Sequence, residues 1–181
     1  MKKVWHELPS NLKEILYKDW LYFVKLKGSL NDYLWDEYGA YDYFIARQFG
    51  VSYTSIEDDI AFVNSIITHA LRNLDEQIIN ELFSMEFLGL DGTISDLSPL
   101  KYMKNLKVID FHCCNESNII DFSPLKDFKS IFVLDYSDYQ LVNFDQTSNI
   151  TNFSNITYIK SYGVPKEMNH VFDLLKHYNL E

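Results

Sequence analysis

The chain has 181 residues, of which 47% are hydrophobic and 23% charged, so a core can be buried and wholesale disorder is excluded. Its formal net charge of −10 argues against binding along a nucleic-acid phosphate backbone, because that contact needs clustered Lys and Arg. Residues 28–71 hold seven acidic residues and one basic residue, Arg47, so this stretch alone carries −6. Such a balance favours a basic partner or simply keeps the chain soluble.

No membrane span is expected, because no apolar run approaches roughly 18 residues. No apolar signal segment follows the charged N-terminus. The two cysteines, Cys113 and Cys114, are adjacent, and adjacent cysteines rarely form a disulfide because the geometry is strained. They also lack the spaced partners of a zinc site. We therefore expect a protein of the reducing cytoplasm with no cofactor.

Residues 1–80 have the pattern of helices. Ser10 is a candidate cap for a helix with Leu12, Ile15 and Leu16 on one face. Thr54-Ser-Ile-Glu57 has the spacing of a capping box, which predicts a second helix after it. Residues 28–50 are aromatic and acidic with poor periodicity, so only short helices are expected there. This region either caps the segment that follows or forms a helical subdomain packed on it.

From about residue 81 the sequence repeats with a period of about 25 residues. Residues 100–111, 125–136 and 150–161 align, and each contains apolar positions spaced as Leu-x-x-Leu-x-Leu, which predicts a short strand. A shorter strand is expected at Glu86–Leu90. Ser-Asp-Leu-Ser-Pro-Leu and Ile-Asp-Phe-Ser-Pro-Leu precede the first two segments. Because proline lacks a backbone donor, Pro99 and Pro124 predict turns outside the sheet.

These two proline-containing segments resemble the internalin-type leucine-rich repeats of bacteria. The resemblance extends roughly from Glu81 to Tyr162, and the third unit departs from it by lacking Ser-Pro-Leu. It implies an α/β fold, a short leucine-rich-repeat solenoid of three to four parallel strands at 81–163. An N-terminal helical region at 1–80 and a C-terminal capping helix at 164–181 complete the expected organisation. Pro165 and the apolar spacing after it predict that this helix runs to about Tyr178.

The resemblance also implies a concave sheet face, lined by the residues between the inward apolar positions. Besides Val108 and Val133, it predicts partner contacts from Asp110, His112, Asp135, Ser137, Tyr158, Lys160 and Tyr162. Equivalent residues of neighbouring strands lie about 4.8 Å apart, so Asp110 and Asp135 are expected side by side. Their mutual repulsion would be relieved by a Lys or Arg of a partner. Simple solvation of both carboxylates is the alternative.

A second candidate surface combines aromatic rings with carboxylates, a composition that suits a basic protein partner. Its predicted contact residues are Trp35, Asp36, Glu37, Tyr38, Tyr41 and Asp42, with Tyr33 and Tyr43 beside them. Some of these rings are expected to be core instead, because the N-terminal region also needs packing. The binding face is therefore either this stretch or the concave sheet.

The sequence contains no phosphate-binding glycine loop and no His-Glu-x-x-His, Cys-x-x-Cys or Gly-x-Ser-x-Gly motif. We therefore expect a non-catalytic protein–protein interaction module of bacterial type. An immunity-like inhibitor of a basic toxin or nuclease is its concrete form. The alternative is a metal-dependent enzyme or regulatory domain that uses Asp32, Asp36 and Asp42, although their spacing does not fit a calcium loop. A scaffold that binds its own copies is a third hypothesis.

Overall fold

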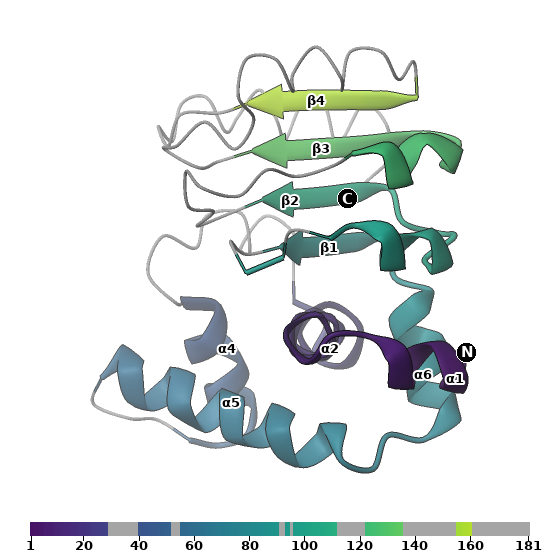
Figure 1. Cartoon of the computed structure of the whole chain (residues 1–181). Coiled ribbons are helices and arrows are strands. Elements are labelled where there is room, and N and C mark those ends of the chain that lie inside the picture. Colours follow the sequence, from purple (N-terminus) through teal and green to yellow (C-terminus); the bar gives the residue numbers. More distant parts are fainter. Residues whose placement is uncertain are drawn as a thin grey trace. The chain divides into compact units, whose positions relative to one another are not determined.

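The computed structural model describes residues 1–28, 40–51, 55–90, 93–94, 96–111, 122–135 and 155–160. The chain divides into two compact units, Met1–Leu82 and Phe83–Glu181. The first is helical, and the second contains a parallel sheet (Figure 1). This confirms the predicted mixture of helices with a short parallel sheet, and of the three to four strands expected the structure describes four. The predicted helix from Pro165 to Tyr178 lies outside the described residues.

The first unit is built from α1 (Lys2–Glu7), α2 (Ser10–Asp19), η1 (Trp20–Lys25), α4 (Ala40–Gln48), α5 (Ile56–Leu71) and α6 (Glu76–Phe83). Helix α5 packs against α4 and α2. The apolar spacing predicted for α2 is confirmed at its centre, since Leu12 and Leu16 are both 1% exposed. Other buried residues of this core are Tyr22, Ile45, Ala46, Val63, Ile67 and Ile79.

Helix α2 differs from the predicted helix at its N-terminal end. Pro9 is its N-cap, and Ser10, the predicted cap, is the first helical residue and makes no capping hydrogen bond from its side chain. At the other end the helix widens into the π-helical segment η1, in which the Leu26 N–H donates to the Leu21 carbonyl. Gly28 follows, and a Cβ atom there would lie 2.4 Å from the Tyr22 ring. Only glycine fits this close approach.

The predicted capping box of α5 is displaced by one residue. Ser55 is the N-cap, and its Oγ accepts a hydrogen bond from the Asp58 N–H at 3.2 Å. Ser55 Oγ also donates to Asp58 Oδ2 at 3.0 Å. The helix begins at Ile56, so Asp58 rather than Glu57 occupies the third helical position, from which a side chain reaches back to the cap.

The Ser55 cap predicts a stability difference between two identical substitutions on one helix. Ser55→Ala should lower the free energy of unfolding by about 1 kcal/mol, because the Asp58 N–H loses its acceptor. Ser65→Ala is the matched control, since Ser65 is exposed and bonds only the Phe62 carbonyl of its own helix. Urea denaturation followed by circular dichroism measures both. Equal losses from the two variants would contradict the assigned cap.

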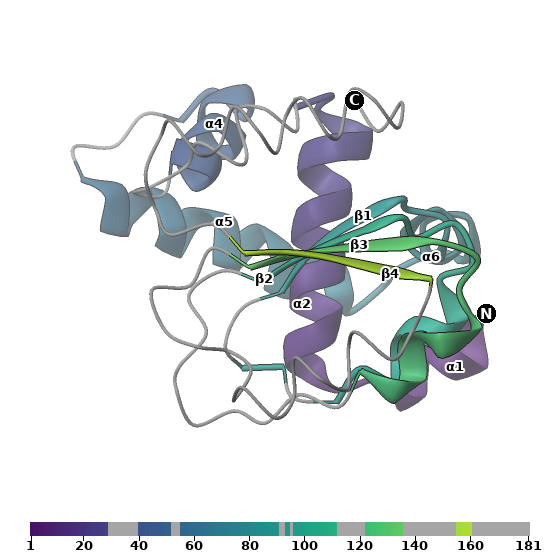
Figure 2. The same ribbon diagram turned by 90° about the horizontal axis from the view of Figure 1, so that it is seen from above.

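The second unit contains one four-stranded parallel sheet in the order β1-β2-β3-β4, which Figure 2 shows edge-on. The strands are β1 (Phe87–Leu90), β2 (Val108–Phe111), β3 (Ile131–Asp135) and β4 (Ile156–Lys160). Each strand lies beside the one that precedes it in sequence.

The register of the sheet shows that its connections are unequal. Phe87 pairs with Val108, Val108 with Phe132, and Ile131 with Ile156. The separation in sequence between paired residues is therefore shortest from β1 to β2, longer from β2 to β3, and longest from β3 to β4. Only the last of the three equals the period by which the aligned segments repeat.

Two short 3₁₀ helices precede β2 and β3, as the proline positions predict. They are η2 (Ser98–Tyr102) and η3 (Ser123–Asp127), and each has proline in its first turn. Leu100 and Leu125, which follow the prolines, are 1% and 0% exposed. The two turns pack against each other. In Figure 1 they lie one above the other beside the tails of the strands.

Asparagine side chains join successive segments of the second unit. Asn155 Nδ2 donates to the carbonyls of Leu125 at 3.0 Å and Phe128 at 2.9 Å. The residue at the equivalent place in an earlier segment is Asn105, whose Nδ2 donates to the Ser84 carbonyl at 3.4 Å from an exposed position. The Asn155 bonds are shorter and partly buried, so they should contribute more to stability.

We therefore predict that Asn155→Ala lowers the free energy of unfolding by about 1–2 kcal/mol, because two carbonyls lose a donor. Asn105→Ala is the control at the equivalent position and should cost about 0.5 kcal/mol or less. Chemical denaturation of both variants provides the measurement. A larger loss from the Asn105 variant would show that these side-chain bonds do not tie β4 to the preceding turn.

Candidate functional site

The predicted partner-binding residues fall into three groups. Seven lie outside the described residues: Trp35, Asp36, Glu37, Tyr38, His112, Ser137 and Tyr162. Four others belong to described helices or strands but are described only in their backbone: Tyr41, Asp135, Tyr158 and Lys160. Asp42 and Asp110 are described in full, and both differ from expectation.

Asp110 does not stand beside Asp135. The β2–β3 register pairs Asp110 with Leu134 and Phe111 with Asp135, because the separation between paired residues of these strands is one position shorter than the repeat of the sequence. The predicted pair of neighbouring carboxylates is therefore wrong by one residue. Since alternate residues of a strand point to opposite faces, this shift also changes which residues share a face.

The predicted open face is also wrong at its described positions. Asp110 is 2% exposed, and Val108 and Val133 are buried with it. All four residues of β2 are buried. Strands covered on both faces have nearly continuous apolar sequences, and Ile131-Phe-Val-Leu134 is such a run. This apolar run indicates that the sheet is covered on both faces. It was missed because only the alternating Leu-x-x-Leu-x-Leu positions were considered.

Asp42 is 5% exposed, so it does not belong to an exposed acidic surface. Its Oδ2 pairs with Lys18 Nζ of α2 at 2.9 Å. The reason is helical spacing: Asp42 lies three and four residues before the buried Ile45 and Ala46, and therefore on the same face of α4. Lys18 compensates the buried carboxylate.

Among the described residues of the first unit, two aromatic side chains are largely exposed to solvent. Tyr43, a neighbour of the second predicted surface, is 38% exposed, and Phe49 is 47% exposed. Arg47 lies over the Tyr43 ring at 5.3 Å, and its guanidinium donates to the Tyr43 hydroxyl at 3.1 Å. Phe49 contacts Phe62 of α5 edge-on, with ring centroids 6.4 Å apart. Exposed Tyr, Phe and Arg are frequent in protein–protein contacts.

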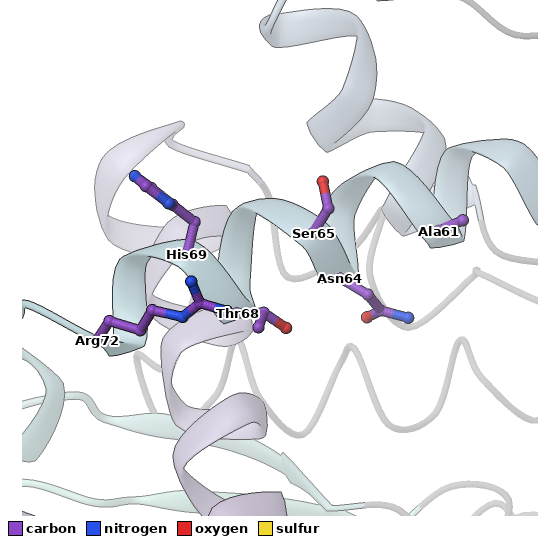
Figure 3. A pocket seen from close by; sticks show the side chains of 6 residues that line it. All are labelled: Ala61, Asn64, Ser65, Thr68, His69 and Arg72. Atoms are coloured by element: carbon purple, nitrogen blue, oxygen red, sulfur yellow. The ribbon is translucent and has the colours of Figure 1, made fainter.

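The outer face of α5 carries a shallow hollow of about 470 Å³ (Figure 3). It is lined by Ala61, Asn64, Ser65, Thr68, His69 and Arg72, all of them exposed. Their spacing of three and four residues places them on one face of the helix. The hollow is open to solvent, so its amide, hydroxyl and cationic groups suit surface recognition better than enclosed chemistry.

Glu81 and Tyr17, both described residues of the first unit, have displaced pKa values. Hydrogen bonds from Gln77 and from the Trp20 indole, at 3.0 and 2.9 Å, lower the pKa of Glu81. Burial raises the pKa of the Tyr17 hydroxyl. Both displacements favour the form already present at neutral pH, an ionised Glu81 and an uncharged Tyr17. Neither residue therefore becomes a proton-transfer group near neutrality.

Within the described part of the chain, no group of three His, Cys, Asp or Glu side chains could hold a metal ion. Asp32 and Asp36 of the hypothetical metal site lie outside that part. Of the helices that the structure describes, none combines the length and the apolar character needed to cross a membrane.

Comparison of the chain with protein-family models, with curated proteins and with solved structures found no match.

The buried position of Asp42 predicts an effect on stability. Asp42→Asn should lower the free energy of unfolding by about 1–3 kcal/mol, because Lys18 loses its counter-ion in a partly buried place. Lys18→Met, alone and combined with Asp42→Asn, completes a double-mutant cycle followed by chemical denaturation. A coupling energy close to zero, with each single variant as stable as the parent chain, would mean that the ion pair contributes nothing.

Proposed function

We propose that the chain is a non-catalytic protein-binding module of leucine-rich-repeat type, and that its partner is a basic protein. An inhibitor that blocks a basic toxin or nuclease, in the manner of an immunity protein, is the concrete form of this proposal. This proposal rests on two features, the repeated sequence of the second unit and the negative net charge of the whole chain.

The observation that carries the proposal is the strand arrangement of the second unit. Parallel strands in sequential order, each paired with its predecessor, support a chain that adds one strand per repeat. The stacked Ser-Pro-Leu turns η2 and η3 support it further. Repeats of this kind form extended surfaces that typically bind other proteins.

The proposed positive charge of the partner follows from the negative net charge of the chain. The chain carries −10, and the stretch from Gly28 to Leu71 contributes −6 of it. Because Asp42 is buried and paired, the exposed described acids of this stretch are Glu57 and Asp58, in the first turn of α5. Opposite charge accelerates association and selects against acidic partners. We therefore place the contact with the basic partner on the acidic part of the first unit.

The test is affinity capture followed by titration at two salt concentrations. The immobilised chain should capture a basic protein from a lysate, and purified complexes should dissociate as salt rises. Glu57→Lys should weaken the complex several-fold, because an exposed charge in the contact is reversed. Glu14→Lys is the matched control, with the same charge change at an exposed position on α2 outside the acidic stretch.

Circular dichroism of both variants confirms that the helices are retained. A partner that is acidic, a complex indifferent to salt, or equal weakening by the two substitutions would contradict the electrostatic contact.

A further inference from the structure

Four lysines of the second unit repeat with the turns that carry them. Ser98-Pro-Leu-Lys-Tyr-Met-Lys104 and Ser123-Pro-Leu-Lys-Asp-Phe-Lys129 place lysine at the same two positions. We refer to Lys101, Lys104, Lys126 and Lys129 as the lysine ladder. Leu100 and Leu125 are apolar in both turns because they are buried, as is Met103. Burial does not explain the four lysines, which are all exposed.

The lysines repeat although part of the surrounding surface does not. The exposed Ser98 and Ser123 are also identical, but Asn105 is replaced by Ser130, and the half-buried Tyr102 by an exposed Asp127. Lysine is therefore found at the same two positions of both turns, although some neighbouring surface residues differ between the turns. Solubility alone does not require this, because a chain with a net charge of −10 is already strongly charged.

The fold brings the lysine-bearing turns together. Helices η2 and η3 pack against each other and lie one above the other in Figure 1, so Lys101 and Lys126, at equivalent positions of the two turns, belong to neighbouring segments. Adjacent segments of a parallel sheet are separated by about 5 Å. Lys104 and Lys129 follow just beyond the ends of these two turns, which close at Tyr102 and Asp127.

The ladder is not neutralised. No ion pair joins any of its ammonium groups to the described residues, and the one contact found among them is that of Lys101 over the Tyr102 ring at 5.1 Å. By contrast, Lys107 in the same unit pairs with Glu86 at 2.8 Å. Like charges at these separations repel one another, and an anionic ligand would remove that repulsion.

A carboxylate-bearing peptide fits this surface better than a nucleic acid does. The net charge of −10 opposes approach of a dense polyanion. The ladder also contains only lysine, whereas both arginines of the chain, Arg47 and Arg72, lie in the first unit. Lysine is a point charge without the rigid fork by which arginine holds phosphate or carboxylate with two bonds, so the ladder attracts anions by charge alone. Asp127, between two ladder lysines, lowers the local positive charge. A segment of spaced carboxylates has a lower charge density than nucleic acid, so the net charge of the chain opposes it less.

We propose that the lysine ladder is a second docking surface, which binds an acidic segment of a partner protein through its side-chain carboxylates. It is separate from the contact with a basic partner, because it lies in the other unit and has the opposite charge. The module would thereby hold two segments of opposite charge, from one partner or from two.

The test uses a fluorescein-labelled peptide of four Glu-Gly repeats, titrated with the full chain at about 50 mM salt and followed by fluorescence anisotropy. Lys126→Glu combined with Lys129→Glu should weaken binding about tenfold or more, since two exposed attractive contacts become repulsive. The matched control is Lys2→Glu with Lys3→Glu, which makes the same charge change at exposed positions of α1 and should weaken binding less than about twofold.

Three outcomes would overturn the proposal. The peptide could fail to bind the parent chain, or the ladder variant and the control could lose affinity equally, which would mean a non-specific effect of net charge. A labelled oligothymidylate of eight nucleotides could also bind more tightly than the peptide, which would assign the ladder to nucleic acid. Binding of the basic partner should survive in the ladder variant, so the two contacts are tested independently.

Discussion

The second unit depends on one constraint: the backbone of every parallel strand must be hydrogen-bonded by its neighbours, and the chain must return to the same end before each new strand begins. The turns η2 and η3 accomplish that return in the segments where the structure describes it. Proline suits this place because its missing donor lies outside the ladder of backbone bonds. Asn155 then donates to the Phe128 carbonyl at the end of η3 and also to the Leu125 carbonyl, which accepts from the Phe128 N–H as well.

Carboxylates in the interior have a different role from the one their charge suggests. Asp42 is held by Lys18, and Asp59 of α5 is buried as well, with an Oδ1 atom that accepts no hydrogen bond from the described residues. Burial of such groups costs stability unless they are paired. The net charge of −10 therefore overstates the acidic surface, and the exposed part of the 28–71 stretch is narrower than its composition implies.

The sequence predicted the elements with the strongest patterns. Four parallel strands, turns at Pro99 and Pro124, and helices over the cores of α2 and α5 follow from apolar spacing and proline chemistry. Features that depend on a single residue position, such as the helix caps, were not predicted correctly. The observed caps are Pro9 and Ser55 rather than Ser10 and Thr54, because a helix start is set by local backbone geometry and not by polar side chains alone.

The candidate site was harder to predict than the fold. The period of the sequence suggested that Asp110 and Asp135 are neighbours, but a connection shorter by one position pairs Asp110 with Leu134 instead. A period is an average, whereas strand register is set by each individual connection. The lysine ladder is visible in the sequence of the first two aligned segments, whereas the third has Thr151 and Ser154 at the equivalent positions. The lysines were overlooked because the repeat was defined by its apolar positions. Burial determines those positions, whereas the lysines are exposed.

The unequal connections have a consequence for folding. Identical repeats can exchange places, because a strand that docks on the wrong neighbour loses nothing and forms a trap. Here the three connections between paired strands all differ in length, so exchanging two strands would join them to their neighbours by connections of different length. The length of the connection that precedes each strand therefore helps to specify the position of that strand in the sheet. This irregularity, which blurs the repeat in the sequence, favours a single order of assembly.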